Sequence, residues 1–463
     1  MAVKTLHLTN SWHQKSGGIA TFYRALIKQA NRRGHPIRLL VPGAETRIEE
    51  CGEFGRIYHI QAPRSLLNSS YRTLYPTQFL SSRSTLQKIL FAERPDLVEI
   101  CDKYTLNYLG PLLRSQLLRS LDFRPVVVGL SCERMDDNVR TYFGAVPLGK
   151  ALCSGYMRWL YFPFFDHHIA NSEYTAGELR AAAGGHWVQR GTWIRHMGAD
   201  LDSLSPERRS GTIRSRLLRY FGASDESVLL LYVGRLVPEK NLALLFDLLF
   251  HLMRTGARDF RLLVVGDGMQ RKRWENESGR RIPGRVRFLG HVHDRSVLAD
   301  LYANADLFLH PNPREPFGIA PLEAMASGLP LIAPNSGGIT SYANRENAWV
   351  VDATIEHFAA AVHQALSDGP LRAAKVKAAL ETARQYEWGR VASSFLDLYG
   401  ELAACRSIDA AAAPAFYSTP GTGLGSAVMR AVSGMAAGTF RLMSGAGSES
   451  PVAAEAGHGL RKS

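Results

Sequence analysis

The sequence is poor in cysteine, and its cysteines are not spaced for a shared site. Five occur among 463 residues, and no C-x-x-C or C-x-x-H pair is present, which argues against structural zinc and a disulfide framework. The sequence contains no run of 18 apolar residues, which a membrane-spanning helix would need. The opening segment MAVKTLHLTNSW lacks the apolar stretch of a secretory signal. We therefore expect a cytoplasmic protein, with at most peripheral contact with the inner face of the cell membrane.

Two signatures of nucleotide-binding enzymes are absent as well. The pattern GxxxxGK[ST] does not occur, which disfavours a P-loop enzyme. The first strand is not followed by GxGxxG, so a dinucleotide-binding domain is not indicated. There is also no arginine-rich arm and no aromatic-basic module, and we expect no nucleic acid partner.

Positive charge is abundant and unevenly distributed. The net charge is +13, of which residues 1–200 carry +9 and residues 201–400 carry +3. The first half is therefore the better candidate to meet an anionic lipid or an acidic polymer. A basic protein without a polyanionic partner would show the same distribution, and this alternative stays open.

Strands alternate with helices along the chain in two successive rounds. The first begins with the strand KTLHLT, the helix GGIATFYRALIKQANRRGH and the strand PIRLLVPG, a β-α-β unit that implies parallel strands. The alternation restarts near residue 200 with SVLLLYVGRL and FRLLVVGDG. This predicts an α/β protein with two facing, doubly wound domains, at 1–190 and 200–385, and a ligand site in the cleft between them. Residues 406–463 are rich in Ala, Gly and Ser, which predicts a mostly disordered tail.

Two cations lie where the second round begins. The segment VGRLVPEKN places Arg235 directly after a strand and Lys240 at the mouth of the following helix. Because Arg binds phosphate in a fork and Lys binds it as a point charge, the pair suits a pyrophosphate. The alternative is a surface ion pair in which Lys240 balances Glu239. Weaker signals come from three glycines in turns, where a ligand can approach the backbone: Gly17, Gly18 and Gly266.

The stretch EPFGIAPLE combines two acids with a turn. Glu315 lies in the loop after the strand ADLFLHP, and a helix that starts at Ile319 places Glu323 about one turn inside. The amides of Phe317, Gly318 and Ile319 would then point at an anion, aided by the helix dipole. The Glu323 carboxylate can accept two hydrogen bonds from a vicinal diol such as a ribose. Helix capping by Glu315 and a dipole contact of Glu323 are the alternatives.

These motifs, in this order, resemble family 4 of the retaining glycosyltransferases, also called glycosyl transferases group 1, over about residues 4–403. The resemblance is specific in GRLVPEKN, VVGDG, VRFLGHV and EPFGIAPLE, and looser in SGGIATFYRALIKQANRRGH and YEWGRVASSFLDLYGEL. The family has the GT-B fold of two facing Rossmann-like domains. It implies an N-terminal acceptor domain, a C-terminal donor domain and a closing helix at 386–405 that packs back towards the N-terminal domain.

The resemblance also implies roles for the site residues. Arg235 and Lys240 would hold the donor diphosphate, Glu315 would bind hydroxyls of the transferred sugar, and Glu323 would bind the ribose. The implied reaction transfers a hexose from a UDP- or GDP-hexose to a glycolipid, lipid-linked or polysaccharide acceptor, with retained anomeric configuration and without a metal or another cofactor. Catalysis would consist mainly of stabilising charge on the departing diphosphate.

One position departs from the family. Cys132 stands in LSCERMDD, where the family usually has a histidine that contacts the donor sugar. Ser131 or Glu133 are candidates to replace it. The departure leaves open a nucleotide-sugar-binding protein with little turnover, and a sugar phosphorylase or disaccharide-phosphate synthase on the same scaffold is a further alternative. The aromatic and basic segments 64–83 and 155–165 suggest either a membrane-facing surface or packing in the core.

Overall fold

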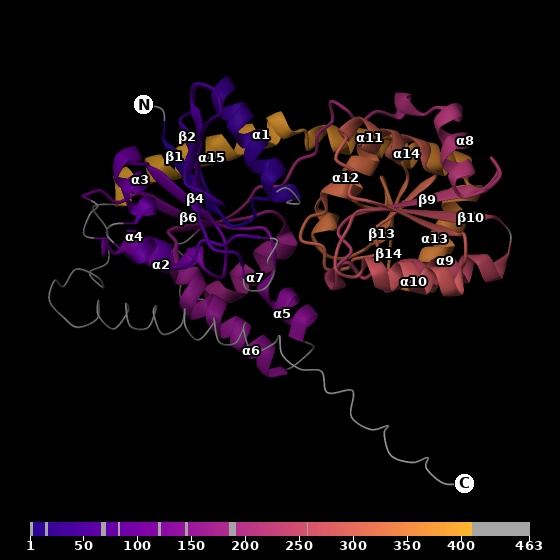
Figure 1. The fold of residues 1–463 in the computed structure, drawn as a ribbon, viewed down its shortest axis with the longest axis horizontal. Coiled ribbons are helices and arrows are strands. Elements are labelled where there is room, and N and C mark those ends of the chain that lie inside the picture. Colours follow the sequence, from indigo (N-terminus) through magenta and orange to yellow (C-terminus); the bar gives the residue numbers. More distant parts are fainter. Residues whose placement is uncertain are drawn as a thin grey trace, which may run out of the picture.

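The structure, a computed structural model, describes residues 3–13, 17–65, 71–81, 84–118, 122–143, 147–184, 191–256 and 258–409. Two α/β domains lie side by side, each with its own central sheet (Figure 1). Residues 410–463 of the predicted tail lie outside the described part of the chain. Helix α15 (Trp388–Asp409) runs past the end of the closing helix predicted at 386–405.

The N-terminal domain is built on an eight-stranded sheet in the order β3-β4-β2-β1-β5-β6-β7-β8. Its neighbouring strands are parallel except for β3 and β4, which are antiparallel. The strands are β1 (Thr5–Thr9), β2 (Ile37–Gly43), β3 (Arg47–Glu50), β4 (Gly55–Gln61), β5 (Leu97–Cys101), β6 (Val126–Ser131), β7 (His167–Ala170) and β8 (Thr192–Ile194). Since β8 pairs with β7, this sheet extends beyond residue 190, where the sequence predicted the domain to end.

The C-terminal domain has a six-stranded parallel sheet in the order β11-β10-β9-β12-β13-β14. The strands are β9 (Val228–Val233), β10 (Phe260–Val265), β11 (Val286–Gly290), β12 (Leu307–Leu309), β13 (Leu331–Pro334) and β14 (Trp349–Val351). Apolar runs such as VLLLYV suit strands that are covered on both faces. The strand order reverses between β9 and β12, and ligands of such sheets bind beyond the carboxyl ends of the strands at this point. The prediction of two doubly wound domains is confirmed.

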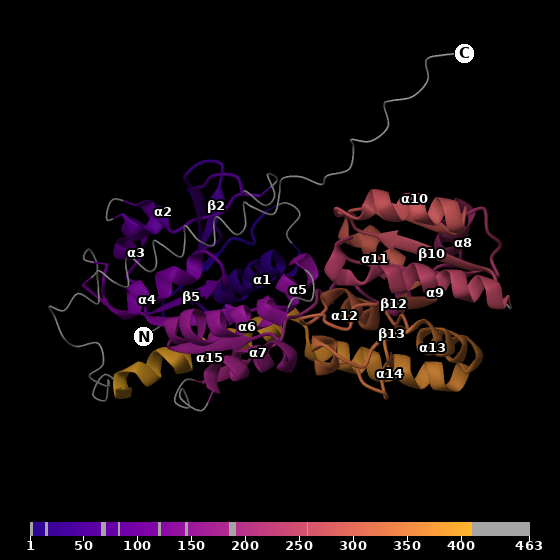
Figure 2. The ribbon, with the colours of Figure 1, turned by 90° about the horizontal axis from the view of Figure 1, so that it is seen from below.

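Helices cover both faces of each sheet, as Figure 1 and the view from below in Figure 2 show. In the C-terminal domain, α8, α11, α12 and α14 pack on one face and α9, α10 and α13 on the other. The helices are α1 (Gly18–Arg32), α2 (Thr77–Leu80), α3 (Thr85–Glu93), α4 (Leu109–Arg114), α5 (Met135–Phe143), α6 (Pro147–Tyr156), α7 (Glu173–Ala183), α8 (Gly211–Tyr220), α9 (Leu242–Thr255), α10 (Arg271–Arg281), α11 (Arg295–Asn304), α12 (Ile319–Ala326), α13 (Ile355–Ser367), α14 (Gly369–Gln385) and α15.

The last helix joins the two domains. In both views α15 leaves the C-terminal domain and lies along α1 of the N-terminal domain (Figures 1 and 2). The rings of Phe22 and Phe395 pack there with centroids 4.7 Å apart. Where the chain crosses between domains, the amide of Ala199 donates to the carbonyl of Tyr386 at 2.8 Å. The two crossing segments are thus bonded to each other at the domain junction.

A buried carboxylate fixes α15 to the N-terminal sheet. Glu99 on β5 is fully buried, as are its partners His7, Tyr23 and Tyr399. One Glu99 oxygen lies 2.9 Å from His7 Nδ1 and accepts a hydrogen bond from the Tyr23 hydroxyl at 3.0 Å. The other accepts from the hydroxyl of Tyr399 on α15. Burial is the main cause that raises the pKa of the Tyr23 and Tyr399 hydroxyls well above the usual range of a phenol, and the charge of Glu99 raises it further. Both hydroxyls therefore stay protonated and act as donors.

Removing the Tyr399 hydroxyl is expected to destabilise the protein. Tyr399→Phe leaves one oxygen of a buried carboxylate without its donor, which should lower the free energy of unfolding by about 2 kcal/mol. The control is Tyr386→Phe, whose hydroxyl donates to the neutral carbonyl of Ser341 at 2.9 Å. Urea unfolding of both variants measures the difference. Equal losses would contradict a special contribution of the Glu99 contact.

Candidate active site

The site predicted at the end of the C-terminal sheet is built from two loops. The short 3-10 helix η6 (Pro238–Lys240) follows β9, and residues 310–318 follow β12, so both lie at the strand-order reversal. Lys240 Nζ contacts both oxygens of Glu315, at 2.8 and 2.7 Å. The structure therefore brings together two residues that stand 75 positions apart in the sequence.

Glu315 is buried and ionised, and its partner Lys240 is half-buried. Glu315 is 7% exposed, and burial alone would raise the pKa of its carboxyl. Lys240, His310 and Asn312 outweigh that effect and lower the pKa of Glu315 to about 2. Burial lowers the pKa of His310 to about 4, against the opposing charge of Glu315. At neutral pH the site thus holds a carboxylate and a neutral imidazole.

His310 and Asn312 are site residues that the sequence analysis did not single out. The Asn312 side-chain amide donates to Glu315 at 3.1 Å, and His310 Nε2 lies 3.6 Å from the same carboxylate oxygen, Oε2. Both stand in HPNPREPFG, directly after β12. Their position at a strand's carboxyl end was a usable signal, since polar side chains there converge on a ligand.

Among the described residues, Arg235 pairs with Glu239 and not with Glu315. Its side chain is 61% exposed and pairs with Glu239 at 3.1 Å. Glu239, which the sequence offered as an alternative partner of Lys240, thus forms an ion pair with Arg235. Arg235 still lies at the end of β9, on the same edge of the sheet as Lys240.

Gly266 has a structural reason to be glycine. Its φ is +133°, and a Cβ atom there would lie 1.9 Å from the carbonyl oxygen of Gly234. Its amide donates to the carbonyl of Gly290 at 2.8 Å. The ends of β9 and β10 approach too closely for a side chain at this position, so close packing explains this glycine without a ligand.

The N-termini of α1 and α12 meet at the domain junction. A Cβ on Gly18 would lie 2.6 Å from Ile319 Cδ1, and the exposed Gly17 precedes it. Gly318, with φ +90°, is the N-cap of α12, and Phe317 before it is buried beside His196, with ring centroids 5.8 Å apart. First-turn amides lack partners within their own helix, so the two helix ends together suit an anion.

Glu323 is fixed by two residues of α11. One of its oxygens lies 2.8 Å from Arg295 Nη1, and the other accepts from the Tyr302 hydroxyl at 2.9 Å. Glu323 is 6% exposed. Arg295 and Tyr302 stand seven positions apart on one helix face, and this spacing was the only sequence signal for them.

Cys132 is unsuited to be a nucleophile. A hydrogen bond with the Cys101 thiol, together with burial, raises the pKa of Cys132 well above its usual value, so the thiol stays protonated. Ser131 and Glu133, the candidates to replace the histidine of the family, both form hydrogen bonds within the protein. Ser131 is fully buried and donates to the carbonyl of Glu133 at 3.2 Å, and the Glu133 carboxylate accepts from Asn138 at 3.0 Å.

The aromatic side chains of segment 155–165 divide between the core and the surface. In segment 155–165, Tyr161, Phe162 and Phe165 are buried in the core, whereas Trp159 is 62% exposed. Segment 64–83 falls partly outside the described residues. Within the described part of the chain, no helix is both long and apolar enough to cross a membrane. Among the same residues, no group of three His, Cys, Asp or Glu side chains could hold a metal ion.

Two family profiles match the chain, one per domain. Glycosyltransferase Family 4 matches residues 16–189, and Glycosyl transferases group 1 matches residues 216–382. A GDP-mannose-dependent alpha-mannosyltransferase of Mycobacterium tuberculosis is 37% identical over 339 residues, covering 73% of this chain and 80% of the relative. A GDP-mannose-dependent alpha-(1-6)-phosphatidylinositol dimannoside mannosyltransferase of the same species is 26% identical over 401 residues, covering 87% and 97%. Among solved structures, sucrose-phosphate synthase from Thermosynechococcus elongatus superimposes with a TM-score of 0.68 at 20% identity, covering 87% of this chain and 100% of that chain.

Proposed function

The chain belongs to family 4 of the glycosyltransferases and has their GT-B fold, and from this premise we propose that it transfers a hexose from a nucleoside-diphosphate sugar to a glycolipid with retention of anomeric configuration. Membership and fold confirm the resemblance stated from the sequence. The single observation that carries the proposal is the ion pair between the half-buried Lys240 and the buried Glu315, beside the N-terminus of α12. A cation next to helix amides supports a diphosphate-binding site there.

Each site residue has a distinct proposed role. Lys240 uses two of its three N–H donors on Glu315, which leaves one for a phosphate oxygen. Arg235, exposed at the end of β9, would exchange Glu239 for the diphosphate. The Glu315 carboxylate and the neutral His310 would bind hydroxyls of the hexose, and Glu323 would bind the ribose.

The proposed reaction balances without an external base. The bond between the anomeric carbon and the diphosphate breaks, and the acceptor oxygen forms the new bond on the same face of the sugar. The acceptor hydroxyl proton passes to the departing diphosphate oxygen. The protein's contribution is to hold both substrates in place and to stabilise the negative charge that develops on the diphosphate, through Lys240 and the amides at Gly318 and Ile319.

The N-terminal domain offers a place for the acceptor. A pocket of about 350 Å³ lies beside β1 and α1 and is lined by Trp12, His13, Ala20, Thr21, Arg24, Pro42 and His59. The Arg24 guanidinium lies 4.7 Å from the centre of the Trp12 ring. An aromatic ring next to a cation suits a sugar-like group that carries a phosphate. Together with the named acceptor of one relative, a phosphatidylinositol dimannoside, this pocket supports a glycolipid acceptor and peripheral contact with a membrane.

A donor panel tests the proposal. Purified protein would be given GDP-mannose, GDP-glucose, UDP-glucose, UDP-galactose and ADP-glucose in turn, with vesicles that contain phosphatidylinositol mannosides. Since two relatives are named as GDP-mannose-dependent, we expect acceptor-dependent release of GDP from GDP-mannose. Tight nucleotide binding without release from any donor would favour a binding protein instead, and release that requires inorganic phosphate would favour a phosphorylase.

A further inference from the structure

Two helices of the N-terminal domain touch the loops of the site. Helix α5 packs against η6, which carries Lys240, and α7 packs against η7 (Gly338–Ser341). Both views place α5 at the side of its domain that faces the other one (Figures 1 and 2). The N-terminal domain therefore contacts the donor loops directly.

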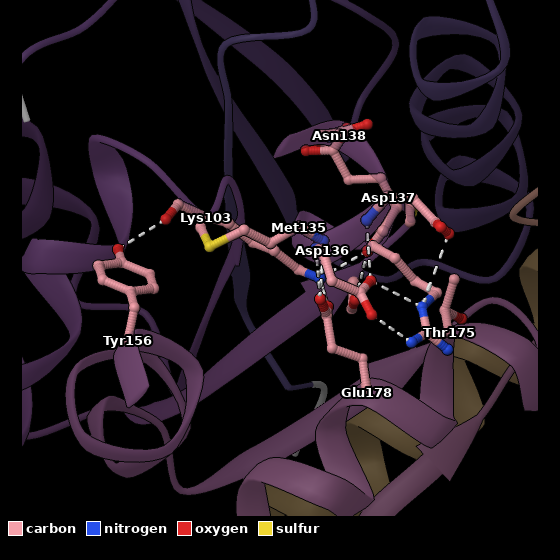
Figure 3. Close-up of polar contacts among 12 residues, drawn as sticks. Lys103, Met135, Asp136, Asp137, Asn138, Tyr156, Thr175 and Glu178 are labelled. Carbon is pink, nitrogen blue, oxygen red and sulfur yellow. Dashed lines mark hydrogen bonds and ion pairs between the residues drawn. The ribbon is translucent and has the colours of Figure 1, made fainter. Parts of the chain in front are cut away.

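A buried ion pair anchors the start of α5. Glu178 of α7 accepts hydrogen bonds from the amides of Met135 and Asp136, at 2.7 and 3.2 Å, with one oxygen. Its other oxygen lies 2.6 Å from Nζ of Lys103, which is 2% exposed. Figure 3 shows Glu178 pointing at this turn, and Tyr156 bonded to the Lys103 carbonyl. The first turn of α5 is thus rigidly attached to the core of its domain.

The next residue, Asp137, is held at the end of this anchored turn. It accepts a hydrogen bond from the hydroxyl of Tyr174 on α7. Arg134 donates two hydrogen bonds to the Asp136 carboxylate, at 2.9 and 2.6 Å. Its Nε also lies 3.7 Å from Asp137 Oδ2. One Asp137 oxygen, Oδ1, remains directed to the domain junction.

From Asp137 a chain of polar contacts crosses the junction and ends in the site. Asp137 Oδ1 lies 3.6 Å from Nε of Arg314, and both side chains are partly buried. The Arg314 amide donates to Asn312 Oδ1 at 3.0 Å, and Asn312 Nδ2 donates to Glu315 at 3.1 Å. Glu315 in turn binds Lys240. The Asp137 carboxylate of the N-terminal domain is thereby linked, through three consecutive contacts, to the Lys240–Glu315 ion pair.

The same loop has a second attachment. Ser172, at the start of α7, donates from its hydroxyl to the carbonyl of Pro316 at 2.5 Å. The Gly338 amide donates to the carbonyl of Glu315 at 2.6 Å. The backbone that directly follows the Glu315 side chain is therefore fixed twice, once from the N-terminal domain and once from within its own domain.

We propose that Asp137 and Arg314 are positioning residues for the transfer: their ion pair across the domain junction sets the place of the loop that carries Glu315. This inference rests on the proposed function of that site. Neither residue belongs to the predicted donor-binding set, and neither contacts Lys240 or Glu315 through its side chain in the described residues. The pair makes the correct geometry of the donor site depend on the meeting of the two domains.

A double-mutant cycle tests the pair. Asp137→Asn and Arg314→Gln are each expected to lower kcat about three- to tenfold, because a loosened Glu315 loop costs orientation in the transition state. The donor KM should change less than about twofold, since the diphosphate contacts remain. The double variant should be no slower than the slower single variant, because both changes remove the same contact.

Two arginines provide matched controls: Arg140→Gln on the exposed part of α5, and Arg345→Gln on an exposed turn of the C-terminal domain. Both should retain wild-type kcat. Full multiplication of the two single effects, or singles within twofold of wild type, would overturn the proposal.

Hydrogen exchange gives a readout that does not need turnover. Asp137→Asn should speed exchange in peptides that contain the Arg314 and Gly338 amides, whereas Arg140→Gln should not. If the wild type transfers no hexose from any donor, the proposed function fails and the exchange result alone decides the positioning proposal. Unchanged exchange in Asp137→Asn would overturn it.

Discussion

Lys240→Ala is expected to lower kcat/KM for hexose transfer by about a thousandfold, the scale seen when one charge-stabilising donor is lost from an active site. The variant removes the cation nearest to the proposed diphosphate position. It also leaves Glu315 without the partner that holds its pKa at about 2. The carboxyl would then take up a proton more readily and lose its geometry toward the sugar. Steady-state kinetics with the accepted donor measures the effect.

Stability must be separated from chemistry in this variant. An unpaired buried carboxylate destabilises a protein by itself, so Lys240→Ala should also unfold at lower urea concentration. Adding Glu315→Gln removes that charge, which should restore stability but not activity. Lys272→Ala, at an exposed lysine on α10, serves as the control for loss of a positive charge. Transfer by Lys240→Ala within tenfold of wild type would contradict the role of Lys240.

Gly266→Ala is expected to cost about 4 kcal/mol of stability, the sum of a strained backbone conformation and overpacking. The new Cβ would lie 1.9 Å from the Gly234 carbonyl oxygen, at a φ of +133°. Since Gly234 immediately precedes Arg235, the clash should also displace the loop that leads to Lys240. Urea unfolding and nucleotide titration of the same variant measure both consequences.

Gly284→Ala provides the matched control for Gly266→Ala. Its φ is +74°, but a Cβ there would meet nothing within 4 Å. It should therefore show only the conformational cost, about 1 kcal/mol. If both variants lost the same stability, close packing of β9 and β10 would not be the reason for Gly266.

The fold was predictable where a strand is long, apolar and followed by an amphipathic helix. That pattern holds for β1, α1 and β2, and again for β9, α9 and β10. The strands β8 and β14, of three residues each, were not predicted, whereas the equally short β12 was predicted from its apolar run ADLFLHP. The missed β8 is the reason that the N-terminal domain was predicted to end at 190.

The sequence predicted that Lys240 and Glu315 lie at one edge of the sheet, but not which side chains they contact. Strand ends located Lys240 and Glu315, because the carboxyl ends of parallel strands meet at one edge. The alternative to a phosphate-binding Lys240 was an ion pair with Glu239, the carboxylate next to it in the sequence. Glu239 instead pairs with Arg235, four positions away, on the same short turn. The contact between Asp137 and Arg314 could not be predicted, because it exists only where two domains meet.

The most direct test of the proposed function is the structure of the product. Wild-type protein would be incubated with isotope-labelled GDP-mannose and phosphatidylinositol mannoside vesicles, and the extracted lipid examined by mass spectrometry and NMR. The proposal predicts one labelled hexose added to the glycolipid, with the anomeric configuration of the donor, and no such product from Lys240→Ala. A product with inverted configuration, or label recovered only as free or phosphorylated sugar, would contradict it.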